Sequence, residues 1–152
     1  MREKNIHFKS ESNEWETPQD LFEKLNEEFC FTLDPCATKE NTKCEKYYTK
    51  KENGLIQDWR DEVVFMNPPY GREISKWIEK AHYETIQEDC LVVCLIPSRT
   101  DTKYWHEFIF PNAEIRFLKG RLKFGGHKNS NSAPFPSAIV IFGGQAGKVQ
   151  YM

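Results

Sequence analysis

The sequence has no run of about 18 apolar residues, and its first 15 residues contain no apolar core of the kind found in signal peptides. We therefore expect no membrane contact and a cytoplasmic location. The sequence also lacks an excess of basic residues, since 21 Lys and Arg face 23 Asp and Glu, for a net charge of −2. Binding to nucleic acid would thus require local basic patches rather than a positive field over the whole molecule.

Cysteine and histidine are too sparse and too scattered for a structural metal site. The five cysteines include no Cys-x-x-Cys pair, and the four histidines show no metal-ligand spacing. These patterns argue against a disulfide framework and a zinc ribbon, so we expect reduced thiols and no bound metal. Aromatic residues, in contrast, make up 14% of the chain, which argues against disorder.

Apolar runs alternate with amphipathic segments along the chain. Strands are predicted for residues 29–34, 63–66, 90–97, 113–118 and 137–142, with a weak strand at 46–48 and a hairpin arm at 121–124. Helices are predicted for residues 17–29, 72–88 and 100–110. This pattern indicates an α/β domain with a mostly parallel sheet and flanking helices. We expect residues 1–13 to be loose and residues 14–152 to form one domain.

The connection between the first two predicted strands is short. Only 28 residues separate Asp34 from Val63, which leaves little room for a parallel crossover and another strand. We therefore expect an abbreviated first half of the sheet, with residues 38–62 forming an irregular segment that partly closes over a ligand.

Polar or proline-containing dipeptides follow three of the predicted strands. Asp34-Pro35, Asn67-Pro68 and Pro97-Ser98 each stand where a strand ends. Ligands of open α/β sheets bind at the carboxyl ends of the strands, so these dipeptides predict one site at one rim.

The tetrapeptide Asn67-Pro68-Pro69-Tyr70 carries the strongest chemical signal. The two prolines stiffen the backbone, so the Asn67 Oδ1 and the Pro68 carbonyl could both accept hydrogen bonds from one exocyclic amino group. Such acceptors stabilise the positive charge that develops on the amine as it attacks a methyl group. Tyr70 would stack on the ring of a base that has been flipped out of a duplex or supplied single-stranded. The alternative is a tight turn with a half-buried Tyr70.

An ordered set of motifs resembles the phage-type DNA N6-adenine methyltransferases, which use S-adenosylmethionine. The set is EWETPQDLF, LDPCAT, ENGLIQDW, NPPYG, PSRTDTKYWHEFIF and APFPSAIVIF, and it covers roughly residues 13 to 143. The resemblance implies an abbreviated class I (Rossmann-like) methyltransferase fold, a DNA partner, and a phage or prophage origin in a bacterial host. NPPY alone is less specific, because protein glutamine methyltransferases share it.

The resemblance also assigns a cofactor site. It places Trp15, Thr17 and Pro18 near the methionine end of S-adenosylmethionine, Asp34 with Pro35 and Cys36 beside the cofactor, Asp58 at the adenine amino group, and Asn67 at the reacting centre. No G-x-G turn follows Asp34, so the close backbone approach usual in methyltransferases is not expected.

Each of these assignments has an ordinary structural alternative. Thr17 and Pro18 could simply start a helix, as its N-cap and first helical residue. Asp34 could end a strand in an Asp-Pro turn, and Asp58 could be a solvated loop charge.

Basic residues gather in one segment near the end of the chain. Arg116, Lys119, Arg121, Lys123 and Lys128 alternate with apolar residues and glycines and could contact DNA phosphates. A solvated edge hairpin explains the same alternation. Arg99, after the strand at 90–97, is a further candidate for DNA contact.

The sequence thus predicts a DNA adenine-N6 methyltransferase whose catalytic residues are Asn67, Pro68, Pro69 and Tyr70. A glutamine-amide methyltransferase, a cytosine-N4 methyltransferase and a non-catalytic module that binds S-adenosylmethionine or DNA remain as alternatives. The target sequence and the oligomeric state are left open.

Overall fold

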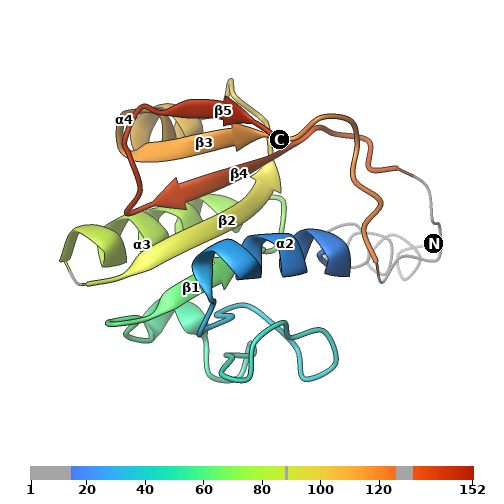
Figure 1. Ribbon diagram of the computed structural model, residues 1–152. Helices are drawn as coiled ribbons and strands as arrows, with labels where there is room; N and C mark the ends of the chain where they lie inside the picture. The colour runs from blue at the N-terminus through green and yellow to red at the C-terminus, as the bar shows by residue number, and fades with distance from the viewer. Residues whose placement is uncertain (1–14, 88, 126–131) are drawn as a thin grey trace, which may run out of the picture.

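The computed structural model describes residues 15–87, 89–125 and 132–152, and these build a five-stranded sheet with helices on both faces (Figure 1). The strand order is β1 (Val63–Met66), β2 (Leu91–Pro97), β4 (Ser137–Phe142), β3 (Ala113–Phe117) and β5 (Val149–Tyr151). The β1–β2 and β3–β5 pairs are parallel, whereas β4 pairs antiparallel with both β2 and β3. Four of the five strands therefore run in one direction, which confirms the mostly parallel α/β sheet.

The helices divide between the two faces of the sheet. Helix α2 (Gln19–Phe29) packs on one face, where the rings of Phe22 and Phe65 lie 5.1 Å apart. The opposite face carries α3 (Ile74–Gln87), the π-helical turn η2 (Trp105–Ile109) and α4 (Phe110–Asn112). No helix in the described residues is both long and apolar enough to cross a membrane. This layered, Rossmann-like arrangement agrees with the fold class predicted from the sequence.

The two central strands of the sheet, β2 and β4, are almost completely buried. Every residue of β4 is buried, as is every residue of β2 except the first. A strand covered on both faces requires a continuous apolar run rather than an alternating one, and LVVCLIP and SAIVIF provide such runs. Both were correctly predicted as strands.

Several weaker strand predictions were wrong. The segment 29–34 contributes only isolated bridges, Leu33 to Val64 and Asp34 to Tyr47, and the second of these is all that forms at 46–48. Residues 121–124 form no hairpin arm; instead, the neighbouring Gly125 pairs with Glu16 near the start of the described chain. The fully exposed edge strand β5 was not predicted, because VQY contains no apolar run.

Helix α2 does not begin as the sequence suggested. Pro18 occupies the N-cap position, and no side chain makes a capping hydrogen bond, so Thr17 is not the N-cap. The helix ends because Cys30 adopts a left-handed conformation with φ of 55°. The Asn26 carbonyl accepts a 2.9 Å hydrogen bond from the Cys30 N–H, and the Asn26 Oδ1 accepts one of 2.8 Å from the Phe31 N–H.

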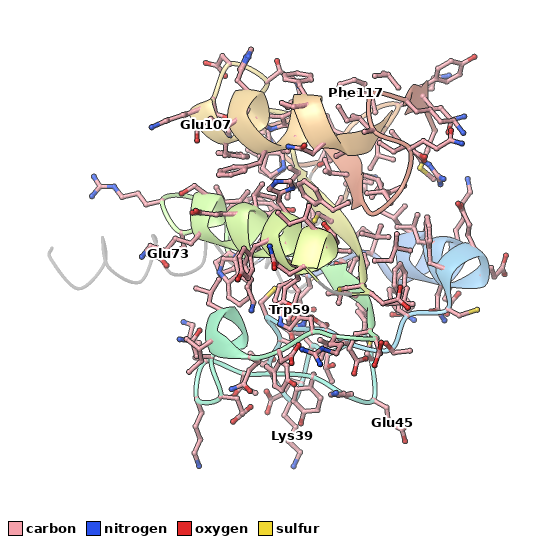
Figure 2. The ribbon with its side chains drawn as sticks, turned by 90° about the vertical axis from the view of Figure 1, so that its left-hand side faces the viewer. Lys39, Glu45, Trp59, Glu73, Glu107 and Phe117 are labelled. Carbon is pink, nitrogen blue, oxygen red and sulfur yellow. The ribbon has the colours of Figure 1, made fainter. Side chains whose placement is uncertain are left out.

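The irregular segment 38–62 is held to the rest of the protein by Trp59. This side chain is fully buried, its Nε1 donates a 3.0 Å hydrogen bond to the Gly54 carbonyl, and its ring stacks on Trp77 of α3 at 6.5 Å. Figure 2 shows Trp59 in the interior, with Lys39 and Glu45 at the outer edge of the segment. The prediction of an irregular segment in place of a full crossover is confirmed.

Gly54 allows the irregular segment to pack closely against Pro35. A Cβ at Gly54 would lie 2.0 Å from the Pro35 carbonyl oxygen, a contact that requires the backbone to move.

We predict that the Gly54→Ala substitution lowers the free energy of unfolding by at least about 1–3 kcal/mol, because the added methyl group overpacks a tight site and strains it. Urea denaturation measures this. Gly125→Ala is the control, since its Cβ would meet nothing closer than 3.5 Å, and equal stabilities of the two variants would contradict the packing argument.

Candidate active site

Asn67 stands at the carboxyl end of β1, where the sequence predicted a catalytic amide. Its Nδ2 donates hydrogen bonds to the Trp15 carbonyl oxygen at 2.5 Å and to the Thr17 Oγ1 at 3.0 Å. Its Oδ1 is buried and has no hydrogen-bond partner within the described part of the chain. Among the described residues, the NH₂ end of this amide is thus paired and the oxygen end is not.

The orientation of the Asn67 amide follows from its partners. A backbone carbonyl can only accept hydrogen bonds, so the group that faces the Trp15 carbonyl has to be the NH₂. The reversed amide would set two oxygens against each other at this short distance. A buried, unpaired acceptor costs about 1–3 kcal/mol, and a ligand N–H at Oδ1 would remove that cost.

Asn67 lines a cavity of about 920 Å³. The walls come from residues within 15–17, 34–43, 49–55 and 67–69, together with Phe65, Glu73, Lys76 and Trp77. The predicted site residues Trp15, Thr17, Asp34, Pro35, Cys36, Asn67, Pro68 and Pro69 all lie in this lining. Asp34-Pro35 and Asn67-Pro68, which are distant in the sequence, therefore meet at one rim as predicted, whereas Pro97 and Ser98, the third predicted pair, do not line this cavity.

Asp34 is the buried carboxylate of the cavity. Only 6% of the residue is exposed, and its Oδ2 accepts a 3.1 Å hydrogen bond from the Lys43 N–H. Burial raises the pKa of Asp34 to about 6, although the hydrogen bonds from the Lys43 and Cys36 backbone lower it. A cation in the cavity would stabilise the ionised form and offset this cost of burial.

Cys36 is a structural thiol. Its Sγ donates to the Asn67 backbone carbonyl at 3.4 Å, and burial raises its pKa well above the ordinary value. A thiol held in this protonated form is a poor nucleophile, so Cys36 contributes shape to the cavity wall rather than covalent chemistry.

Tyr70 is buried in an aromatic cluster that it forms with Trp15, Phe124 and Phe135. Its hydroxyl donates to the Leu95 carbonyl at 3.2 Å, and its ring meets the Phe135 ring edge-on at 5.6 Å. The Trp15 ring contacts Phe124 at 5.4 Å and Phe135 at 5.3 Å. Tyr70 does not line the main cavity. The sequence did not predict that Phe135 packs in this cluster, although Phe135 lies inside the motif APFPSAIVIF.

Two predicted cofactor residues lie away from the cavity. Pro18 belongs to the start of α2, where its carbonyl accepts the Phe22 N–H at 3.1 Å. Asp58 is exposed, and its Oδ1 accepts a 2.8 Å hydrogen bond from the Arg60 N–H. Neither residue lines the cavity, whose wall includes Gly54, Leu55 and Trp77, and their contact with the cofactor stays a prediction.

Arg116 is committed to an intramolecular ion pair. Its NH1 and NH2 each donate to a carboxylate oxygen of Glu28 at 2.7 Å, and NH2 lies 3.1 Å from Glu114 Oε2. The guanidinium also lies over the Phe29 ring at 5.5 Å, and the side chain is only 14% exposed. These interactions hold α2 to β3 and give Arg116 a structural role, and its predicted contact with DNA stays a prediction.

The other predicted DNA contacts remain at the surface. Lys119, Arg121 and Lys123 are exposed, and Lys128 lies outside the described residues. Arg99 is exposed as well and lies over the Phe135 ring at 5.8 Å. Arg99 thus joins the aromatic cluster to the surface of the protein.

Comparison with known proteins gives the family. The model of the family described as DNA N-6-adenine-methyltransferase (Dam) matches residues 5–148. The chain belongs to this family.

Two curated relatives match different shares of this Dam family member. The DNA N-6-adenine-methyltransferase of Escherichia phage T1 is 28% identical over 138 residues, which cover 88% of this chain and 56% of the phage protein. The protein named "Putative methyltransferase YfdM" of Escherichia coli strain K12 is 36% identical over 78 residues, which cover 46% of this chain and 86% of that protein. The chain thus spans little more than half the length of the phage relative.

Asp34 makes the stability of this Dam family member depend on pH. The folded carboxyl has a pKa of about 6 against an ordinary value of 3.8, so the native state binds more protons between these values. The free energy of unfolding should therefore fall as pH rises from about 4 to about 6 and then level off.

We predict that the free energy of unfolding of the Asp34→Asn variant does not fall between pH 4 and pH 6. Above pH 6 the variant should be more stable than the wild type by up to about 3 kcal/mol. Urea denaturation across the pH range measures the difference between the two proteins. A difference that does not change between pH 4 and 7 would show that Asp34 is not the titrating group.

Proposed function

We propose that the protein is a DNA adenine-N6 methyltransferase that takes its methyl group from S-adenosylmethionine. The single observation that carries this proposal is the Asn67 amide, whose Nδ2 is fully engaged and whose buried Oδ1 lacks a partner among the described residues. An exocyclic amine is the donor that such an acceptor suits. The Dam family match supports DNA adenine as the substrate.

The cavity residues fit S-adenosylmethionine. A cavity of about 920 Å³ is within the range of small-molecule sites, which is roughly 300–1,000 Å³. Asp34 provides a buried negative charge for a cationic cofactor, while Phe65, Trp77 and Leu55 provide apolar wall. When bound, S-adenosylmethionine would supply a methyl group on a sulfonium, so that bond formation from N6 to the methyl carbon would be balanced by loss of the sulfur–carbon bond, with its electron pair on sulfur.

Asn67 and Pro68 act on the adenine amine. The Asn67 Oδ1 and the Pro68 carbonyl would accept hydrogen bonds from the two N6 protons and stabilise the positive charge on nitrogen during transfer. The N6 proton is then lost to solvent, which leaves neutral N6-methyladenine. Because Oδ1 is buried, side chains around it have to move when the base enters.

The exposed cations hold the DNA. Arg99, Lys119, Arg121 and Lys123 are exposed and available for phosphate contacts, whereas Arg116 is paired with Glu28. Tyr70 and the aromatic rings around it supply a surface on which a flipped adenine stacks once the cluster opens.

The proposal is tested by incubating the protein with isotope-labelled S-adenosylmethionine and DNA and identifying the product by mass spectrometry. We expect label in N6-methyladenine. Label in N4-methylcytosine or in protein glutamine would assign the same chemistry to another substrate, and binding without any transfer would make the protein a non-catalytic module.

We predict that Asn67→Ala reduces kcat by about 10²–10³-fold, because it removes one preorganised contact to the developing charge. The affinity for S-adenosylmethionine, measured by calorimetry, should change little, because this contact forms with the amine rather than with the cofactor. Turnover within a few-fold of the wild type would make Asn67 a structural residue.

A further inference from the structure

Thr17 has an unusual position for a threonine that precedes a helix. It stands directly before Pro18 and α2, yet it makes no capping hydrogen bond to the helix. Only 5% of the residue is exposed, and its Oγ1 accepts a 3.0 Å hydrogen bond from the Asn67 Nδ2. The buried hydroxyl therefore binds the Asn67 side chain, directly after β1, rather than the backbone of its own helix.

The Asn67 amide has two N–H groups, and the segment 15–17 offers two acceptors for them. One is the Trp15 carbonyl oxygen at 2.5 Å, and the other is the Thr17 Oγ1 at 3.0 Å. A 180° flip of the amide would bring Oδ1 against the Trp15 carbonyl and break that hydrogen bond, and the Thr17 hydroxyl would then have to donate rather than accept. Two bonds fix the plane of the amide as well as its direction, which one bond alone would not do.

We propose that Thr17 is a positioning residue, whose hydroxyl acts with the Trp15 carbonyl to hold the Asn67 Oδ1 ready for the substrate amine. The inference rests on the proposed methyl transfer. An acceptor that is already oriented needs no reorganisation as charge develops on N6, and a misplaced one reduces the rate steeply. Thr17 thus contributes to kcat although it does not touch the reacting atoms.

The sequence resemblance gave Thr17 a different role, as a contact to the methionine end of the cofactor. The two roles separate kinetically. A contact to the cofactor is present before and during the reaction, so its loss raises KM with kcat preserved. A contact that only orients Asn67 lowers kcat and leaves the KM for S-adenosylmethionine nearly unchanged.

The test compares Thr17→Val, which keeps the shape and removes the hydroxyl, with Thr17→Ser, which keeps the hydroxyl. We expect Thr17→Val to lower kcat by about 10- to 100-fold with KM for S-adenosylmethionine within about threefold. Thr17→Ser should recover most of the lost kcat. Thr85→Val is the control, because Thr85 donates to the His82 carbonyl at 2.9 Å within α3 and does not line the cavity. A rise in KM alone, or no recovery in Thr17→Ser, overturns the proposal.

A second measurement does not depend on catalysis. If the amide is held as proposed, both Nδ2 protons of Asn67 exchange slowly with water in the wild type. NMR on ¹⁵N-labelled protein measures this exchange. One of them should shift and exchange faster in Thr17→Val, and neither should in Thr85→Val. If the wild type methylates no DNA but shows this pattern, the proposed function fails and the positioning of Asn67 stands. Fast exchange of both protons in the wild type overturns the positioning itself, even where Thr17→Val fails to fold.

Discussion

The pair of hydrogen bonds from the Asn67 Nδ2 to the segment 15–17 is the interaction on which the site depends. It joins the carboxyl end of β1 to the chain that leads into α2, and so brings together two walls of the same cavity. Because both N–H groups of the amide are occupied, its Oδ1 is left as a buried acceptor. The two hydrogen bonds therefore set the direction in which the Asn67 Oδ1 meets the substrate amine in the proposed reaction.

The remaining walls are positioned by packing rather than by regular structure. Trp59 is fully buried against Trp77, and its hydrogen bond to Gly54 holds an irregular segment where a crossover helix would otherwise stand. Asp34 comes from a segment that pairs with β1 only through isolated bridges. An abbreviated sheet can thus still form a cavity of about 920 Å³, because irregular segments within 34–43 and 49–55 supply much of its wall.

The sequence predicted what depends on local patterns and missed what depends on distant partners. The apolar runs of β2 and β4 and the position of Asn67 at a strand end are local features, and all were correct. The ion pair of Arg116 was missed because the alternating sequence around it looks the same whether the side chain is solvated or paired with Glu28, 88 residues earlier in the chain. Thr17 was assigned as an N-cap by a local rule, whereas its partner is 50 residues away.

The most direct test of the account is the distance from the Asn67 Oδ1 to the adenine N6 in a crystal structure with S-adenosylhomocysteine and a DNA strand that contains the target base. We predict a hydrogen bond of about 2.7–3.2 Å, with Nδ2 still donating to the Trp15 carbonyl and the Thr17 hydroxyl. An amide turned the other way, or an N6 beyond hydrogen-bonding distance of Oδ1 in a complex that is competent for transfer, would contradict it.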